Sequence, residues 1–152
     1  MDSIAQMLTT LKNAVAAHKS DVVLKYTKIN HEIVKILHAH KYISDVSVKK
    51  LKNDKAERVA KGSATKSSTD KSAAAPERQE LVVRPHYIDG SPMINNIRRI
   101  SKPSRRLYAK SHELRDTRQG FGMWIVSTSK GIMTGADAHK QNLGGEIIAE
   151  VW

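Results

Sequence analysis

The sequence predicts an α+β protein of two small modules: an N-terminal module with the order α-β-α-β-β, and a C-terminal module of mostly antiparallel β structure with short helices. Two observations support this class. Apolar residues recur at helical spacing in two N-terminal segments, and short apolar strands recur in the C-terminal half. After the turn signal Asp89-Gly90 the pattern changes register near Ile94. We therefore predict modules over residues 1–91 and 92–152.

The N-terminal module is predicted to alternate helices and strands. Residues 2–17 form the first helix, which Asp2 or Ser3 can cap, because five apolar side chains share one face: Ile4, Met7, Leu8, Leu11 and Val15. The elements that follow are a strand from Asp21 to Tyr26, a helix from Lys28 to Lys41 that Thr27 can cap, and a strand over residues 42–52. Glu80–Arg84 predicts a further strand, which can pair with residues 42–52.

Residues 53–78 interrupt this pattern. The segment has no aromatic residue and one sizeable aliphatic side chain, Val59. Such a composition buries too little apolar surface to offset the entropy of ordering. We therefore predict a disordered insertion that forms a long hairpin loop, with a transient helix around residues 54–61 as an alternative.

The C-terminal module is predicted to contain short strands and two short helices. A turn at Pro103 separates strands around Ile97–Ile100 and Leu107–Ala109. The elements that follow are a helix over Glu113–Gln119, a strand over Met123–Val126, a helix over Gly135–Asn142 and a strand from Ile147 to Val151. Thr134 and Asp137 form a variant capping box for the second helix, and Gly144-Gly145 is predicted to end it.

The chain is strongly basic throughout. Its formal net charge is +11, and residues 1–52, 53–78 and 79–152 carry net charges of +5, +2 and +4. A basic excess of this size favours a nucleic-acid partner. A membrane surface is the rival, but no apolar run approaches the ~20 residues that span a bilayer. The start of the chain does not resemble a secretory signal, and the absence of cysteine excludes disulfides and thiolate metal sites.

The segment 98–110 is the first candidate for nucleic-acid binding. It contains no acidic residue and six basic ones that can contact phosphates: Arg98, Arg99, Lys102, Arg105, Arg106 and Lys110. Ser104 lies among them, and Tyr108 offers a ring for stacking on a base or sugar. The alternative is an edge strand whose charges are solvated and prevent aggregation.

The second candidate is the hydroxyl-rich loop Ser127-Thr128-Ser129-Lys130-Gly131, which is predicted to follow a buried strand. Its hydroxyls suit base edges, ribose 2′-hydroxyls and phosphates, and Gly131 allows a sharp turn. A polar turn bonded to its own backbone is one alternative. Another is the Ser127-x-x-Lys130 spacing of serine acyltransferases, which requires a helix that Gly131 disfavours. His31 and His38 lack a companion acid at ligand spacing, so we predict no metal site.

Four stretches resemble the bacterial-type member of the universal eighth small-subunit ribosomal protein family. They are DSIAQMLTTLKNA at the start, Lys28 with Lys41-Tyr42-Ile43, the basic stretch IRRISKPSRRLY, and VSTSKGIMTGADAHKQNLGGEIIAEVW at the end. The last stretch is long and specific, and together the four cover the chain apart from residues 53–78. Ser104 departs from the glycine usual at its position.

The resemblance implies a non-enzymatic ribosomal protein with a two-domain fold. Its implied partners are the central domain of small-subunit rRNA, where it would organise a helix junction during assembly, and neighbouring small-subunit proteins. The implied RNA contacts are Ser127, Thr128, Ser129, Lys130, Gly131, Glu146 and Tyr108, with backbone contacts from Lys12, Asn13 and Lys28. We add Lys102, Ser104, Arg105 and Arg106 from the basic segment. We expect no cofactor, membrane or small-molecule substrate.

The resemblance also implies a location and a second role. The chain is expected in the cytoplasm, in a bacterial small ribosomal subunit, with a mitochondrial or plastid ribosome as the alternative. Some bacterial members repress translation of their own operon, so this protein is a candidate repressor. A binder of many messenger RNAs remains the rival interpretation.

Overall fold

The computed structural model describes residues 2–51, 78–114 and 122–152. The predicted insertion 53–78 lies outside these residues except for Arg78, which is the first residue of a strand instead. The predicted helix Glu113–Gln119 also lies largely outside them. Its first residue, Glu113, ends a 3₁₀ turn (η1, Ser111–Glu113) rather than beginning a helix.

The N-terminal half is an antiparallel three-stranded sheet covered by two helices. The strands are β1 (Val22–Lys25), β2 (Ile43–Leu51) and β3 (Arg78–Pro85), in the order β1-β3-β2. The helices are α1 (Ser3–Ala16), capped by the Asp2 carboxylate, and α2 (Lys28–Ala39), capped by the Thr27 hydroxyl. Pairing of β2 with β3 confirms the predicted hairpin around the insertion.

The C-terminal half is a second antiparallel sheet with one short helix. Four of its strands lie in the order β6 (Ile97–Arg99), β10 (Gly145–Val151), β8 (Met123–Thr128) and β9 (Gly131–Thr134). A fifth strand, β7 (Tyr108–Ala109), also pairs with β10. Helix α3 (Gly135–Lys140) packs on one face of this sheet, where its Ala138 forms a small buried cluster with Val126 of β8 and Leu114. Between the halves, a small hairpin of β4 (Tyr87–Ile88) and β5 (Ser91–Pro92) turns at Asp89-Gly90, as predicted.

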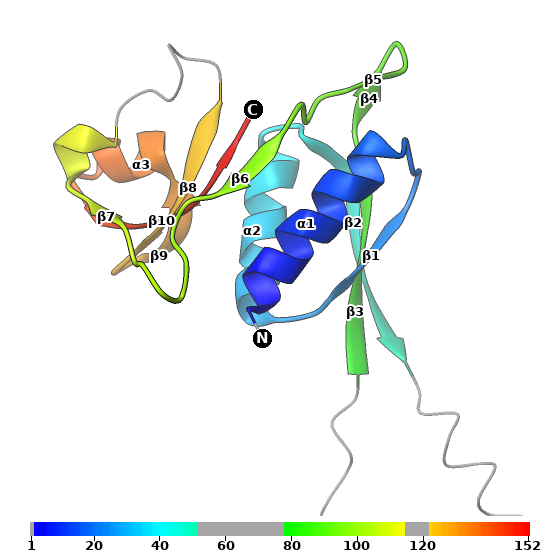
Figure 1. Ribbon diagram of the computed structural model, residues 1–152, viewed down its shortest axis with the longest axis horizontal. Helices are drawn as coiled ribbons and strands as arrows, with labels where there is room; N and C mark the ends of the chain where they lie inside the picture. The colour runs from blue at the N-terminus through cyan, green and yellow to red at the C-terminus, as the bar shows by residue number, and fades with distance from the viewer. Residues whose placement is uncertain (1, 52–77, 115–121) are drawn as a thin grey trace, which may run out of the picture.

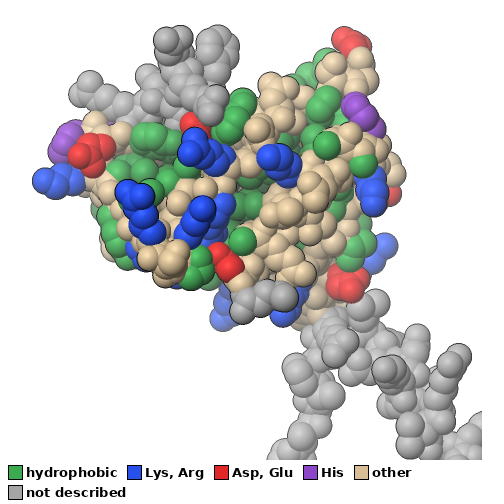
Figure 2. Space-filling model, in the orientation of Figure 1, with side chains coloured by type: hydrophobic (Ala, Val, Ile, Leu, Met, Phe, Trp, Pro, Cys, Tyr) green, Lys and Arg blue, Asp and Glu red, His purple; other side chains and the backbone are tan. Residues whose placement is uncertain are grey.

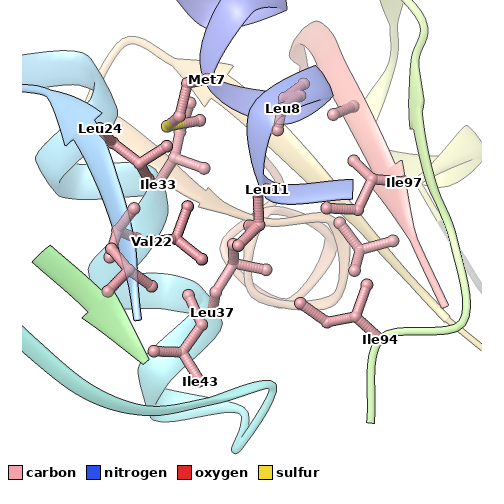
Figure 3. Close-up of a cluster of buried hydrophobic side chains, with 14 of the residues drawn as sticks. Met7, Leu8, Leu11, Val22, Leu24, Ile33, Leu37, Ile43, Ile94 and Ile97 are labelled. Carbon is pink, nitrogen blue, oxygen red and sulfur yellow. The ribbon is translucent and has the colours of Figure 1, made fainter. Parts of the chain in front are cut away.

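Helices α1 and α2 lie between the two sheets (Figure 1). Their apolar faces form one core with residues of both halves, which Figure 3 shows pointing toward one another. The core includes Leu11 of α1, Leu37 of α2 and Ile97 of β6, all at most 5% exposed. The α+β class and the order of the N-terminal elements are therefore confirmed, and both halves share one core. Within the described residues, no helix is long and apolar enough to cross a bilayer.

Two predictions for the C-terminal half were wrong. Residues 127–131 are not an extended loop before a helix, because Gly131–Thr134 form strand β9, which pairs with β8. Gly144-Gly145 does not end a helix either. Helix α3 stops at Lys140, Asn142 has a left-handed φ of 54°, and Gly145 already belongs to β10.

Candidate RNA-contact surface

The hydroxyl-rich segment forms a tight hairpin between β8 and β9. Thr128 pairs with Gly131, so only Ser129 and Lys130 remain in the turn. Gly131 has a φ of +115°, in a region that favours glycine. The Thr128 hydroxyl donates to the carbonyl of Gly131 (2.9 Å) and accepts from the N–H of Lys130 (3.2 Å). The polar-turn interpretation thus holds for Thr128, while Ser129 and Lys130 are exposed at the tip.

This hairpin excludes the geometry of the acyltransferase alternative. The Ser-x-x-Lys arrangement requires a helix that places the lysine one turn from the serine. Ser127 instead lies within a strand and Lys130 lies in the hairpin turn. The ammonium group is therefore not presented to the Ser127 hydroxyl by a helical backbone.

Four side chains form a row across the C-terminal sheet, which we call the contact row: Tyr108, Glu146, Ser127 and Ile132. Tyr108 of β7 pairs with Glu146 of β10, Glu146 pairs with Ser127 of β8, and Ser127 pairs with Ile132 of β9. Directly paired residues of an antiparallel sheet project from the same face. Tyr108 is 71% exposed at one end of the row. The structure therefore brings together Tyr108, Glu146 and Ser127, which are far apart in the sequence.

The glycine pair Gly144-Gly145 allows this row to form. A Cβ on Gly145 would lie 2.1 Å from the carbonyl oxygen of Ser127, and one on Gly144 would lie 2.8 Å from that of Ala109. Neither contact is compatible with a side chain at these positions. The absence of side chains lets β10 pass closely between β7 and β8, so Gly145 is a site residue that the sequence analysis missed.

Glu146 is held in place by two donors. Its Oε1 accepts a hydrogen bond from the hydroxyl of the fully buried Ser101 and one from Arg106 NH1 at 2.7 Å. Burial alone would raise the pKa of the Glu146 carboxyl. The hydrogen bonds from Ser101 and Arg106, and the positive charges of Arg106 and Arg99, outweigh burial and lower the pKa. Glu146 is therefore ionised at neutral pH.

A pH-dependent contribution to stability follows from Glu146. Because its pKa is lower in the folded than in the unfolded chain, the contribution is present above about pH 4.3, the ordinary glutamate value, and is lost as pH falls through the folded value. We expect Glu146→Gln to be less stable than the unchanged protein near pH 6, with the difference shrinking toward pH 3. Urea unfolding across this range measures it. A difference independent of pH would show that ionisation of Glu146 contributes nothing.

The loop between β6 and β7 presents the basic residues. Lys102 and Arg105 exchange two backbone hydrogen bonds of 3.0 Å across a turn that contains Pro103. Their side chains and that of Ser104 are exposed, and neither cation has an ion-pair partner among the described residues. Figure 2 shows Lys and Arg side chains gathered over this part of the molecule. Ser104 does not have a positive φ, so the loop forms without the glycine usual in the family.

Arg99 is a correction to the set of predicted phosphate contacts. Its side chain is 13% exposed, and its NH2 group lies 3.1 Å from Oδ2 of Asp2. Burial lowers the pKa of Arg99; the negative charge of Asp2 partly offsets this effect. An arginine enclosed in this way contacts the protein interior rather than a phosphate. Arg98 and Lys110, by contrast, are exposed.

The predicted N-terminal contacts divide into two groups. A groove of about 390 Å³ separates the contact row from the first turns of α1 and α2, where Ile4 and Ile29 line it. Lys28 is exposed and directly precedes Ile29 at the start of α2. Lys12 and Asn13 are exposed much further along α1, and Asn13 lines a separate hollow. Lys28 is therefore adjacent in the chain to a residue that lines this groove, whereas Lys12 and Asn13 are not.

The described residues contain no group of three or more side chains suited to a metal ion. His31 and His38 do share one side of α2, where they line a shallow hollow with Lys35 and Asp45. The His31 ring also lies against Tyr26, with ring centroids 5.6 Å apart.

Comparison with known proteins gives a match over nearly the whole chain. The family model described as ribosomal protein S8 matches residues 2–152. Small ribosomal subunit protein uS8 of Persephonella marina is 36% identical over 99% of this chain and 98% of its own length. The uS8 protein of Zymomonas mobilis is 34% identical over 99% and 97%, and uS8c of Chlorella vulgaris is 34% identical over 99% and 98%. The match includes the contact row and the basic loop.

Proposed function

The chain belongs to the ribosomal protein S8 family, whose members are non-enzymatic ribosomal proteins, and from this premise we propose that it binds small-subunit rRNA through the contact row and the adjacent basic loop. The observation that carries the proposal is the row itself. It combines an exposed aromatic residue, a fixed carboxylate and the Ser127 hydroxyl, and the exposed cations of the basic loop lie beside it. RNA recognition uses this combination of stacking, polar contacts to bases and 2′-hydroxyls, and neutralisation of phosphates.

The proposed mechanism is binding without chemistry. Lys102, Arg105 and Lys130 are exposed cations that neutralise phosphates and release counterions, which supplies affinity. Ser129 at the hairpin tip and Ser127 in the row present hydroxyls that have no side-chain hydrogen bond within the described residues. These hydroxyls and the Tyr108 ring supply specificity. Lys28 of α2 adds a contact to the RNA backbone, and Lys12 and Asn13 contact a separate part of the RNA backbone.

The C-terminal module, residues 92–152, therefore supplies the main contacts, and residues 1–91 supply the secondary ones. The proposed target is the central domain of small-subunit rRNA, where the protein fixes a helix junction beside neighbouring small-subunit proteins. The relatives include a bacterial protein and a plastid-type protein, which supports the proposal that this chain belongs to a bacterial-type ribosome. Repression of its own messenger RNA would use the same surface.

The function is tested by co-sedimentation and by RNA binding. The tagged protein is expected to co-sediment with the small ribosomal subunit and to prefer a central-domain rRNA transcript over a shuffled transcript of equal length. Equal affinity for both transcripts would favour a general RNA binder, and absence from the subunit would contradict the ribosomal role.

Ser129 tests the hairpin tip directly. Replacement of Ser129 by tryptophan is expected to weaken binding of the central-domain transcript about tenfold, because losing one or two polar contacts costs about 1–1.5 kcal/mol. Binding of the shuffled transcript should change much less, since no cation is removed. The matched control is Ser47→Trp, at an exposed position of β2 in the other sheet. An equal loss on both transcripts would mean that the tip contributes only to general affinity.

A further inference from the structure

We infer that the ion pair between Asp2 and Arg99 positions the Glu146 end of the contact row, so that the start of α1 and the RNA-contact surface act as one unit. The inference rests on the proposed function and deepens it, because it assigns roles to two residues that are not themselves RNA contacts. Arg99 is a positioning residue, and Asp2 is the residue that holds it.

Asp2 has two separate tasks. Its Oδ1 accepts hydrogen bonds from the backbone N–H groups of Ile4 (3.1 Å) and Ala5 (3.3 Å), which caps α1. Its Oδ2 lies 3.1 Å from Arg99 NH2, within ion-pair distance although the two groups are not aligned as a hydrogen bond. The Asp2 side chain is 19% exposed. The charge of Oδ2 is therefore directed at Arg99 rather than at solvent.

Arg99 continues the connection to the contact row. Its Nε donates to the carbonyl oxygen of Ser101 at 2.5 Å, and the Ser101 hydroxyl donates to Glu146 Oε1. Ser101 is further fixed by its own N–H, which donates to the carbonyl of Ile147 at 3.1 Å. Glu146 is the residue that pairs with both Tyr108 and Ser127. An unbroken series of contacts thus leads from the cap of α1 to the centre of the row.

The position of Arg99 depends on Asp2 because the guanidinium is largely buried. Its NH1 has no hydrogen-bond partner among the described groups, so Asp2 and the Ser101 carbonyl hold the side chain. A buried charge that loses its partner becomes costly and moves toward water. Such a movement would release the Ser101 carbonyl and loosen the orientation of the Ser101 hydroxyl toward Glu146. The contact row would then lose its fixed geometry without losing any RNA-contacting group.

Two substitutions distinguish the positioning role of the Asp2–Arg99 pair from the capping of α1 and from the positive charge of Arg99. Asp2→Asn keeps an oxygen that caps α1 about as well as aspartate but removes the charge that faces Arg99. Arg99→Lys keeps the positive charge but removes the planar group that contacts Asp2 and Ser101 simultaneously. The matched control is Asp21→Asn, which breaks the 3.1 Å ion pair between Asp21 and Arg84 in the N-terminal sheet, away from the row.

Affinities of the three variants and the unchanged protein are measured for the central-domain transcript and the shuffled transcript, well below each melting temperature. We expect Asp2→Asn and Arg99→Lys to lose about 2- to 30-fold in affinity for the central-domain transcript, the usual range for substitutions within a network of coupled contacts. Affinity for the shuffled transcript and the salt dependence should stay unchanged, because no phosphate contact is lost. A merely destabilising substitution would lower binding of both transcripts together.

The outcomes distinguish this inference from the proposed function. Normal discrimination in both variants, or losses equal to those of Asp21→Asn, would overturn the positioning role alone. Absence of discrimination in the unchanged protein would overturn the proposed function and this inference with it.

Discussion

Replacement of Gly145 by alanine is expected to lower the free energy of unfolding by about 3 kcal/mol or more, since overpacking of this kind is costly, and to abolish preferential binding of the central-domain transcript. The added Cβ would lie 2.1 Å from the carbonyl oxygen of Ser127 and 2.9 Å from its carbonyl carbon. Both atoms belong to the backbone of β8, so no side-chain rotation relieves the contact. β8 or β10 must move, and Ser127 and Glu146 move with them. Chemical unfolding and binding to the two transcripts measure the two effects.

Gly131→Ala is the matched control for this substitution. Nothing lies within 4 Å of a Cβ at Gly131, so alanine there meets no neighbour. Its cost is the unfavourable φ of +115°, which is worth about 1–3 kcal/mol for a residue with a side chain. If Gly145→Ala cost no more than Gly131→Ala, the close approach of β10 to β8 would not be required for the fold.

The two glycines show how far the sequence predicts this fold. The caps and apolar faces of α1 and α2 and the β2–β3 hairpin are encoded by neighbouring residues, and the predictions for them were confirmed. The requirement for glycine at position 145 comes instead from Ser127, which is distant in the sequence. A glycine pair after a helix is also the usual signal for a helix end. That local interpretation was wrong because Asn142 already provides the left-handed residue.

Strand β9 was missed for a related reason. It has four residues, too few to show a clear alternation, and pairing with β8 stabilises it. Its first residue, Gly131, was interpreted only as a turn residue. Since the hairpin turn holds Ser129 and Lys130 alone, the predicted five-residue loop divides into a two-residue tip and two strand ends.

The contact row depends on information that composition does not carry. Family resemblance named Tyr108, Ser127 and Glu146 separately, but only the strand register aligns them. The basic composition of segment 98–110 likewise predicted that Arg99 contacts phosphates together with the exposed arginines. Its burial results from Asp2 at the start of α1, nearly a hundred residues earlier in the chain. Long-range packing, rather than local pattern, separates positioning residues from contact residues here.

The affinity of the protein for the central-domain transcript is expected to fall about 500-fold between about 50 and 200 mM monovalent salt. Exposed cations near the contact row that can reach phosphates are Lys28, Lys102, Arg105, Arg106 and Lys130. About five phosphate contacts predict a slope near −4.5 in a plot of log affinity against log salt, because each neutralised phosphate contributes about −0.9. Titrations at several salt concentrations measure the slope. A nearly flat response would contradict a phosphate-dominated interface.

Single substitutions show which residues produce this salt dependence. Arg105→Gln is expected to reduce its magnitude by about 0.9, one phosphate contact, because Arg105 is exposed and has no ion-pair partner among the described residues. Lys49→Gln, at an exposed position of β2, should leave the slope unchanged. Arg106 should give a smaller change than Arg105, since its NH1 already donates to Glu146 at 2.7 Å and part of its charge is neutralised within the protein. Equal changes for Arg105→Gln and Lys49→Gln would mean that the slope reports net charge rather than contacts made by the basic loop.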